Sequence, residues 1–113
     1  MKNIIIYQFY LMYKWNSEEI KNQVGLFFKL YRLRKGLSQF QVATEIDLSK
    51  DYIGRIERGK TNPTIEIIIA ICNFLEIDIL NVFSKISQSQ LDSMINETKL
   101  LEEKFKNQNK RKS

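Results

Sequence analysis

The residue types that most often perform catalysis or hold a metal are scarce in this chain of 113 residues. There is no histidine and one cysteine, Cys72, which lies inside the apolar run from Ile65 to Leu75. A single chain therefore cannot assemble a zinc cluster or a disulfide, and neither a glycine-rich phosphate loop nor a cleft with paired carboxylates is visible. We expect no enzyme activity, no cofactor and no metal site. Cys72 is interpreted as a buried residue of the hydrophobic core. The absence of a disulfide framework is typical of proteins in a reducing cytoplasm.

The chemistry that the chain does offer is ionic. It carries 18 basic residues against 13 acidic ones, a formal net charge of +5. An excess of this sign favours a polyanionic partner, although many basic proteins are merely soluble. The length allows one compact domain with an appendage.

The segment from Gln39 to Arg58 must position any such basic residues, and its pattern predicts two short helices joined by a tight turn. Apolar residues recur at helical spacing on both sides of a break, namely Val42, Ala43 and Ile46 before it and Ile53 and Ile56 after it. The break itself holds Asp47, which tolerates a left-handed backbone, then the apolar Leu48 and the helix cap Ser49. Ala43 is small enough to let the two helices cross steeply. The segment therefore predicts a helix-turn-helix.

Further helices are predicted on both sides of this motif. Apolar spacing indicates a helix from Ser17 to Lys35 that ends at Gly36, and Ser38 with Gln41 forms a capping box for the next helix. Beyond the motif, a helix capped by Thr64 carries so many isoleucines that it should be buried on most sides, and Asp78 caps a short fifth helix. The predicted fold class is all-α, with five helices in the domain.

The C-terminal part of the chain predicts an additional helix. Residues 84–90 are rich in serine and glutamine and indicate a linker. Residues then repeat in steps of three and four, which is the spacing of a helical seam: Leu91, Met94, Thr98, Leu101 and Phe105. A helix with so short a seam needs a surface to lie on. We favour a second subunit, and packing back on its own domain is the alternative. Residues 108–113 are predicted to be a disordered basic tail.

The N-terminal run from Ile4 to Tyr13 is apolar and aromatic, behind Lys2. It is shorter than the ~20 residues of a membrane span, and no small-residue cleavage site follows it, so we expect neither a membrane anchor nor export. An arm that packs on the domain or on a second subunit is one interpretation. The other is an upstream extension without function, with Met12 as the natural start. The resulting division is 1–19 extension, 20–84 domain, 85–107 C-terminal helix and 108–113 tail.

Several of these residues resemble the Xre type of lambda-repressor-like helix-turn-helix domain. The resemblance runs from about Val24 to Phe83 and includes neither terminus. Its motifs are Arg32, then Leu37-Ser38-Gln39, Val42-Ala43, the run Ile53-Gly54-Arg55-Ile56-Glu57-Arg58-Gly59-Lys60, and Asn62-Pro63-Thr64. Asp47 departs from the pattern, because the family usually has glycine in the turn.

The resemblance implies double-stranded DNA as the partner and assigns roles to individual residues. The helix at 49–58 would enter the major groove, where the expected base contacts are Lys50, Asp51, Tyr52 and Arg55. The expected phosphate contacts are Ser38, Gln39, Arg58, Lys60, Thr61 and Asn62. Arg32 and Glu57 are expected to form a structural ion pair between the first helix and the recognition helix.

The function that follows from the resemblance is that of a cytoplasmic, homodimeric regulator of transcription that binds a DNA operator, with repression favoured over activation. Two alternatives stay open. One is a controller protein of a restriction-modification system. The other is an antitoxin or protein-interaction module whose termini bind a partner protein.

Overall fold

The computed structural model describes residues 4–5 and 14–112, without the side chains of residues 111 and 112. The predicted run from Ile4 to Tyr13 lies almost entirely outside this part. From residue 14 onward the regular elements are all helices: α2 (Ser17–Arg34), α3 (Gln39–Glu45), α4 (Lys50–Glu57), α5 (Ile65–Leu75), α6 (Ile79–Val82) and α7 (Gln88–Lys112). The predicted all-α class is confirmed, with α2 to α6 as the five-helix domain and α7 as the additional helix.

The helix ends follow the local chemistry of the sequence. The Ser38 hydroxyl accepts a hydrogen bond from the Gln41 backbone N–H, and the Gln41 side chain accepts one from the Ser38 N–H, which completes the capping box of α3. Thr64 and Asp78 cap α5 and α6. After α2, Gly36 adopts a left-handed φ of 69°, a conformation that glycine reaches without strain.

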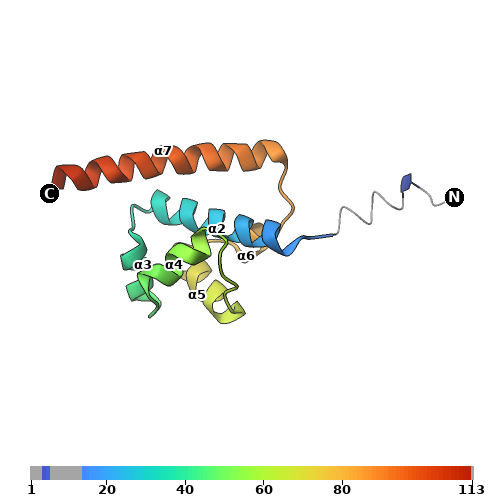
Figure 1. The fold of residues 1–113 in the computed structure, drawn as a ribbon, viewed down its shortest axis with the longest axis horizontal. Helices are drawn as coiled ribbons and strands as arrows, with labels where there is room; N and C mark the ends of the chain where they lie inside the picture. The colour runs from blue at the N-terminus through green and yellow to red at the C-terminus, as the bar shows by residue number, and fades with distance from the viewer. Residues whose placement is uncertain (1–3, 6–13, 113) are drawn as a thin grey trace.

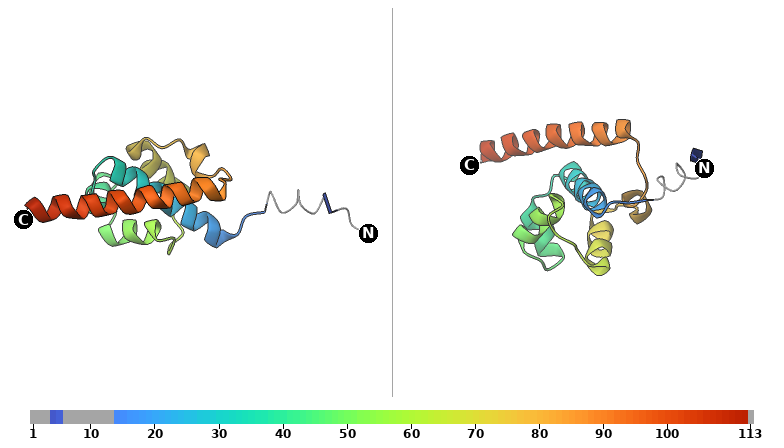
Figure 2. Two further views of the ribbon diagram at one scale, coloured as in Figure 1. Left: turned by 90° about the horizontal axis from the view of Figure 1, so that it is seen from above. Right: turned by 45° about the vertical axis from the view of Figure 1, so that its right-hand side comes forward.

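Helix α2 lies at the centre of the arrangement. Figures 1 and 2 show α7 along one side of α2, with α3, α4 and α5 on the other side. The core between α2 and the motif helices is formed by buried apolar side chains, among them Val24, Phe28, Val42, Ile53 and Leu75. The domain is therefore built around the same helix that carries α7.

Helix α5 corrects one expectation. Ile68 and Ile71 are buried, but Ile65 is 71% exposed and Ile69 is 43% exposed, so the helix is not buried on most sides. Among the described residues, one face of α5 packs on the core and the other stays exposed. Leu80 of α6, at 76% exposure, adds to the apolar surface outside the core.

Helix α7 corrects two further expectations. The predicted linker ends early, because Ser87 begins the helix: its hydroxyl accepts from the Gln90 N–H, and the Gln90 side chain accepts from the Ser87 N–H. At the other end the helix continues to Lys112, so residues 108–112 are helical rather than a disordered tail. Serine and glutamine here supply a cap, which a reading by composition missed.

The predicted seam packs on the chain's own domain. Met94 lies against the core cluster, and Thr98, one turn further on, is buried with its hydroxyl donating to the Met94 carbonyl. Arg34 of α2 donates two hydrogen bonds to the Glu97 carboxylate, at 2.6 and 2.7 Å. Lys29 of α2 pairs with Glu102. This face of α7 thus packs on α2, which is the alternative arrangement.

Acidification is expected to weaken the docking of α7 on α2. Hydrogen bonds from Arg34 and Lys29 hold the pKa values of Glu97 and Glu102 below the ordinary value of 4.5. The stabilisation is therefore fully present above about pH 4.5 and is lost as the pH falls through the lowered values. Backbone amide shifts of α7 in NMR spectra from pH 7 to pH 3 would report it.

The matched control replaces both acids, Glu97→Gln and Glu102→Gln. This variant should show weakened docking at neutral pH and little further response to acid. Amide shifts in α7 that stay constant until the whole domain unfolds would contradict the expectation.

Candidate nucleic-acid interface

A buried ion pair fixes α4 against α2. The Arg32 Nε donates to Glu57 Oε2 at 2.6 Å, and the Arg32 Nη2 donates to Glu57 Oε1 at 3.0 Å. Both residues are nearly excluded from solvent, at 5% and 9% exposure. A third guanidinium N–H donates to the Leu37 carbonyl at 2.8 Å. A bidentate ion pair of this kind has a defined geometry, so it fixes the orientation of α4 relative to α2.

The same carboxylate also positions Gln39 at the start of α3. The Gln39 amide nitrogen donates to Glu57 Oε1 at 3.0 Å. An amide nitrogen carries two N–H donors, so one donor is left for a group outside the protein. Gly54 lies beneath the side chains of Gln39 and Arg58. A Cβ at this position would be 3.0 Å from an Arg58 nitrogen and 3.5 Å from the Gln39 amide nitrogen. Glycine leaves room for both side chains at the surface.

These residues surround an open depression between α3 and α4. Its volume is about 470 Å³, and it is lined by Gln39, Lys50, Asp51, Gly54, Arg55 and Arg58. Three cations face it against one carboxylate. Every charged residue of the set is exposed. The depression can therefore receive a polyanion and also present several hydrogen-bond donors to it.

The other predicted contact residues lie in different surroundings. Tyr52 is half-buried against the core, and the Arg55 guanidinium carbon lies 5.7 Å from its ring centre, so Tyr52 supports Arg55 from below. The Ser38 hydroxyl already accepts the capping hydrogen bond. Lys60 is exposed in the loop after α4. Thr61 and Asn62 line a separate depression with Phe83.

Sequence reasoning identified a basic C-terminal end but missed its position beside the motif helices. An open groove of about 620 Å³ has Ser38, Gln39 and Lys50 on one side, and on the other side residues of α7, namely Phe105, Lys106, Asn109 and Lys110. Only the packing of α7 on α2 brings these residues together. A signal was present in the acids Glu97 and Glu102, which could have been matched with the basic end of α2.

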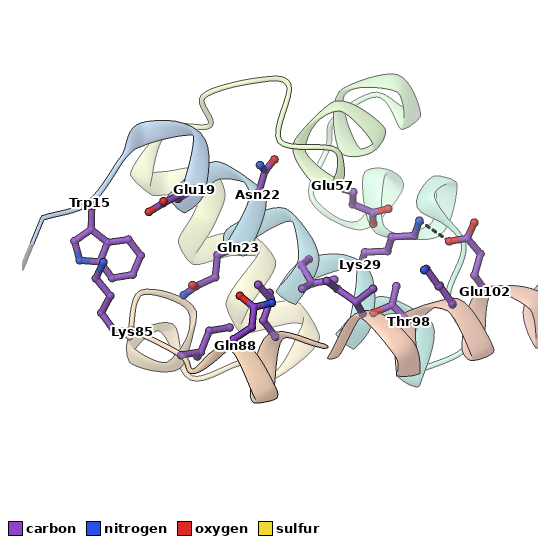
Figure 3. Close-up of a pocket in the computed structure, with 15 residues that line it drawn as sticks. Trp15, Glu19, Asn22, Gln23, Lys29, Glu57, Lys85, Gln88, Thr98 and Glu102 are labelled. Carbon is purple, nitrogen blue, oxygen red and sulfur yellow. Dashed lines mark ion pairs between the residues drawn. The ribbon is translucent and has the colours of Figure 1, made fainter. Parts of the chain in front are cut away.

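A larger cavity of about 680 Å³ lies between α2 and α7 (Figure 3). Leu26, Leu91 and Ile95 are among its apolar lining residues. Of its polar residues, Gln23 donates to the Val82 and Ser84 carbonyls, and the Lys85 ammonium lies 4.3 Å from the Trp15 ring centre. Within the described residues no buried side-chain nitrogen or oxygen lacks a partner. Among the described residues, this cavity thus has no buried polar side-chain atom that lacks a partner.

No group of histidine, cysteine, aspartate and glutamate in the described part of the chain could hold a metal ion. Among the helices that the structure describes, none combines the length and apolarity needed to cross a membrane.

The chain is similar to known proteins over its helical domain. Residues 28–80 match the family described as Helix-turn-helix. The chain is 39% identical over 61 residues to the HTH-type transcriptional regulator SlrR of Bacillus subtilis (strain 168), a match that covers 53% of this chain but only 40% of the relative.

A solved structure is also similar to the chain, with a TM-score of 0.51 and 29% identity over 70% of this chain and 93% of the other. It is the restriction-modification controller protein C.Esp1396I, as a tetramer in complex with its natural 35 base-pair operator.

Proposed function

Because residues 28–80 belong to the Xre type of the helix-turn-helix family, we propose that the chain is a sequence-specific DNA-binding regulator of transcription. The observation that carries the proposal is the depression between α3 and α4, where Lys50 and Arg55 stand exposed beside the anchored Gln39. Helix α4 enters the major groove, and the two cations donate to guanine O6 and N7. Asp51 accepts from cytosine N4.

Phosphate contacts orient α4 in the groove. Gln39 supplies its remaining amide N–H, and Arg58 supplies a guanidinium at the same rim. Ser38, Lys60, Thr61 and Asn62 contribute from helix ends and loop. These contacts carry no sequence information by themselves, but they set the register in which Lys50 and Arg55 meet the bases.

The regulator acts as a homodimer, because one recognition helix covers only ~4 to 5 base pairs and a second copy supplies the other half-site. The C.Esp1396I complex, an oligomer on its operator, supports this assembly. Ile65, Ile69 and Leu80 provide an exposed apolar surface for the second copy, whereas Met94 of the predicted seam already packs on the core. Occupying a promoter blocks polymerase without any effector, which favours repression.

The likeness to C.Esp1396I also favours a second, narrower function, that of a controller protein in a restriction-modification system. Such a protein would act on DNA through the same residues. A neighbouring methyltransferase gene would distinguish it from a general repressor. The antitoxin or protein-interaction alternative has no comparable support.

Replacing Arg55 by alanine is expected to weaken binding to the operator by ~1 to 3 kcal/mol, since a base contact is lost, and to leave binding to unrelated DNA almost unchanged. Fluorescence anisotropy with an operator selected in vitro and with a scrambled duplex would measure both. Lys104→Ala is the matched control, because it removes a charge at an exposed position outside both grooves. Equal affinity of the wild-type protein for the two duplexes would refute sequence-specific regulation.

A further inference from the structure

The C-terminal end of α7 lies beside the residues that are proposed to contact DNA. Phe105, Lys106, Asn109 and Lys110 form one wall of the groove whose other wall holds Ser38, Gln39 and Lys50. We propose that this end of α7 is a second DNA-contacting element, which binds the phosphate backbone next to the half-site read by α4. The inference rests on the proposed function and extends it to a part of the chain outside the matched residues 28–80.

The spacing of the α7 residues suits a contact along a backbone. Lys106 and Lys110 are four residues apart, and Asn109 precedes Lys110, so the three side chains share one face of the helix. That face turns toward the same groove as Lys50. A phosphate strand that leaves Gln39 therefore meets donors from α7 as its next neighbours.

The position of this end of α7 is set by contacts with α2. The Lys29–Glu102 and Arg34–Glu97 pairs join the two helices along their length. Phe105 is half-buried and lines the same groove as Leu33 of α2. The docked helix thus carries its last turns past the end of α2, where Phe105 and Lys106 line the groove with Ser38 and Gln39, and the end marked C projects beyond the domain (Figure 1).

Lys106 can turn to a phosphate at little cost. It lies 3.6 Å from Glu102, and its side chain is 69% exposed. An exposed pair at this distance contributes little. Glu102 keeps Lys29 as a partner when Lys106 leaves, so no carboxylate is left without a counter-ion.

The charge of this segment identifies the class of partner. From Lys104 to the end, the sequence contains five basic residues and no acidic one. Such a surface is complementary to a polyanion. Because its neighbours across the groove are Gln39 and Lys50, the polyanion that reaches both walls is the DNA that those residues contact.

The test compares two double variants with equal loss of charge on the same helix. Lys106→Gln with Lys110→Gln removes the two cations that α7 contributes to the groove. Lys99→Gln with Lys104→Gln removes two exposed cations outside it. Anisotropy titrations from 50 to 300 mM salt, with the selected operator and with the scrambled duplex, give the slope of log K against log salt. Circular dichroism checks that each variant keeps its helices.

The groove variant is expected to lower the magnitude of the salt slope by about 2, since each lost phosphate contact removes ~0.9. Its affinity should fall by a similar factor on both duplexes, and hydroxyl-radical protection of the backbone flanking the half-site should disappear. The control variant should keep the wild-type slope and footprint.

Equal slopes for the two variants would overturn the inference, as would a gain in affinity on removing the groove cations, which would mean that α7 hinders binding. Failure of the proposed function looks different. In that case the wild-type protein would bind the operator and the scrambled duplex equally, and the slopes could still be compared on either one.

Discussion

Replacing Glu57 by alanine is expected to lower the free energy of unfolding by ~3 to 5 kcal/mol, because the buried Arg32 guanidinium would lose its counter-ion while it stays out of water. For a small domain this is a large share of the total stability. Chemical denaturation followed by circular dichroism would measure it.

Two controls separate the buried charge from other effects of this substitution. Arg34→Ala breaks an ion pair of the same kind at an exposed position and should cost less than ~1 kcal/mol. The double variant Arg32→Met with Glu57→Leu should be much closer to wild-type stability than Glu57→Ala, since no charge is then left unpaired. A loss below ~1 kcal/mol in Glu57→Ala would show that water reaches Arg32.

Replacing Gly25 by alanine is expected to destabilise the domain by ~1 to 3 kcal/mol, because a Cβ on this turn of α2 would lie 2.5 Å from the carbonyl oxygens of Ile56 and Glu57. Those atoms belong to backbone, so relief requires α2 and α4 to separate. The sign of the change in unfolding free energy is informative, because alanine in place of glycine at a helix position without such a clash would stabilise the domain by ~1 kcal/mol.

Denaturation of Gly25→Ala alongside Asn96→Ala, an exposed position of α7, provides the comparison. The Asn96 variant should be neutral or slightly stabilised. If the Gly25 variant were stabilised as well, the close approach of α2 and α4 would be disproved.

The sequence predicted the features that depend on near neighbours. Ser38 with Gln41, Thr64 and Asp78 cap their helices within three residues, and Asp47 takes a left-handed φ of 58° in the turn where glycine is usual. Such features depend on local hydrogen bonds and backbone sterics, which a single sequence displays directly.

The sequence did not predict the features that depend on which helix faces which. Ala43, expected at the crossing of the two motif helices, is buried, but no local signal marked Gly25, where a Cβ would lie 2.5 Å from the backbone of α4. The partner of the α7 seam could not be chosen either, since a stripe of apolar residues fits α2 of its own chain as well as a second subunit. The hydrogen bond from Gln39 to Glu57 likewise joins residues 18 positions apart.

The groove between α7 and the motif helices has a thermodynamic consequence. It exists only while α7 is docked on α2, because each of its two walls comes from a different side of that contact. A ligand that touches both walls must therefore favour the docked arrangement. Reciprocity then requires that docking raises the affinity for this ligand by the same factor by which the ligand strengthens docking. A substitution at Glu97, which does not line the groove, would in this way alter how tightly the groove holds a polyanion.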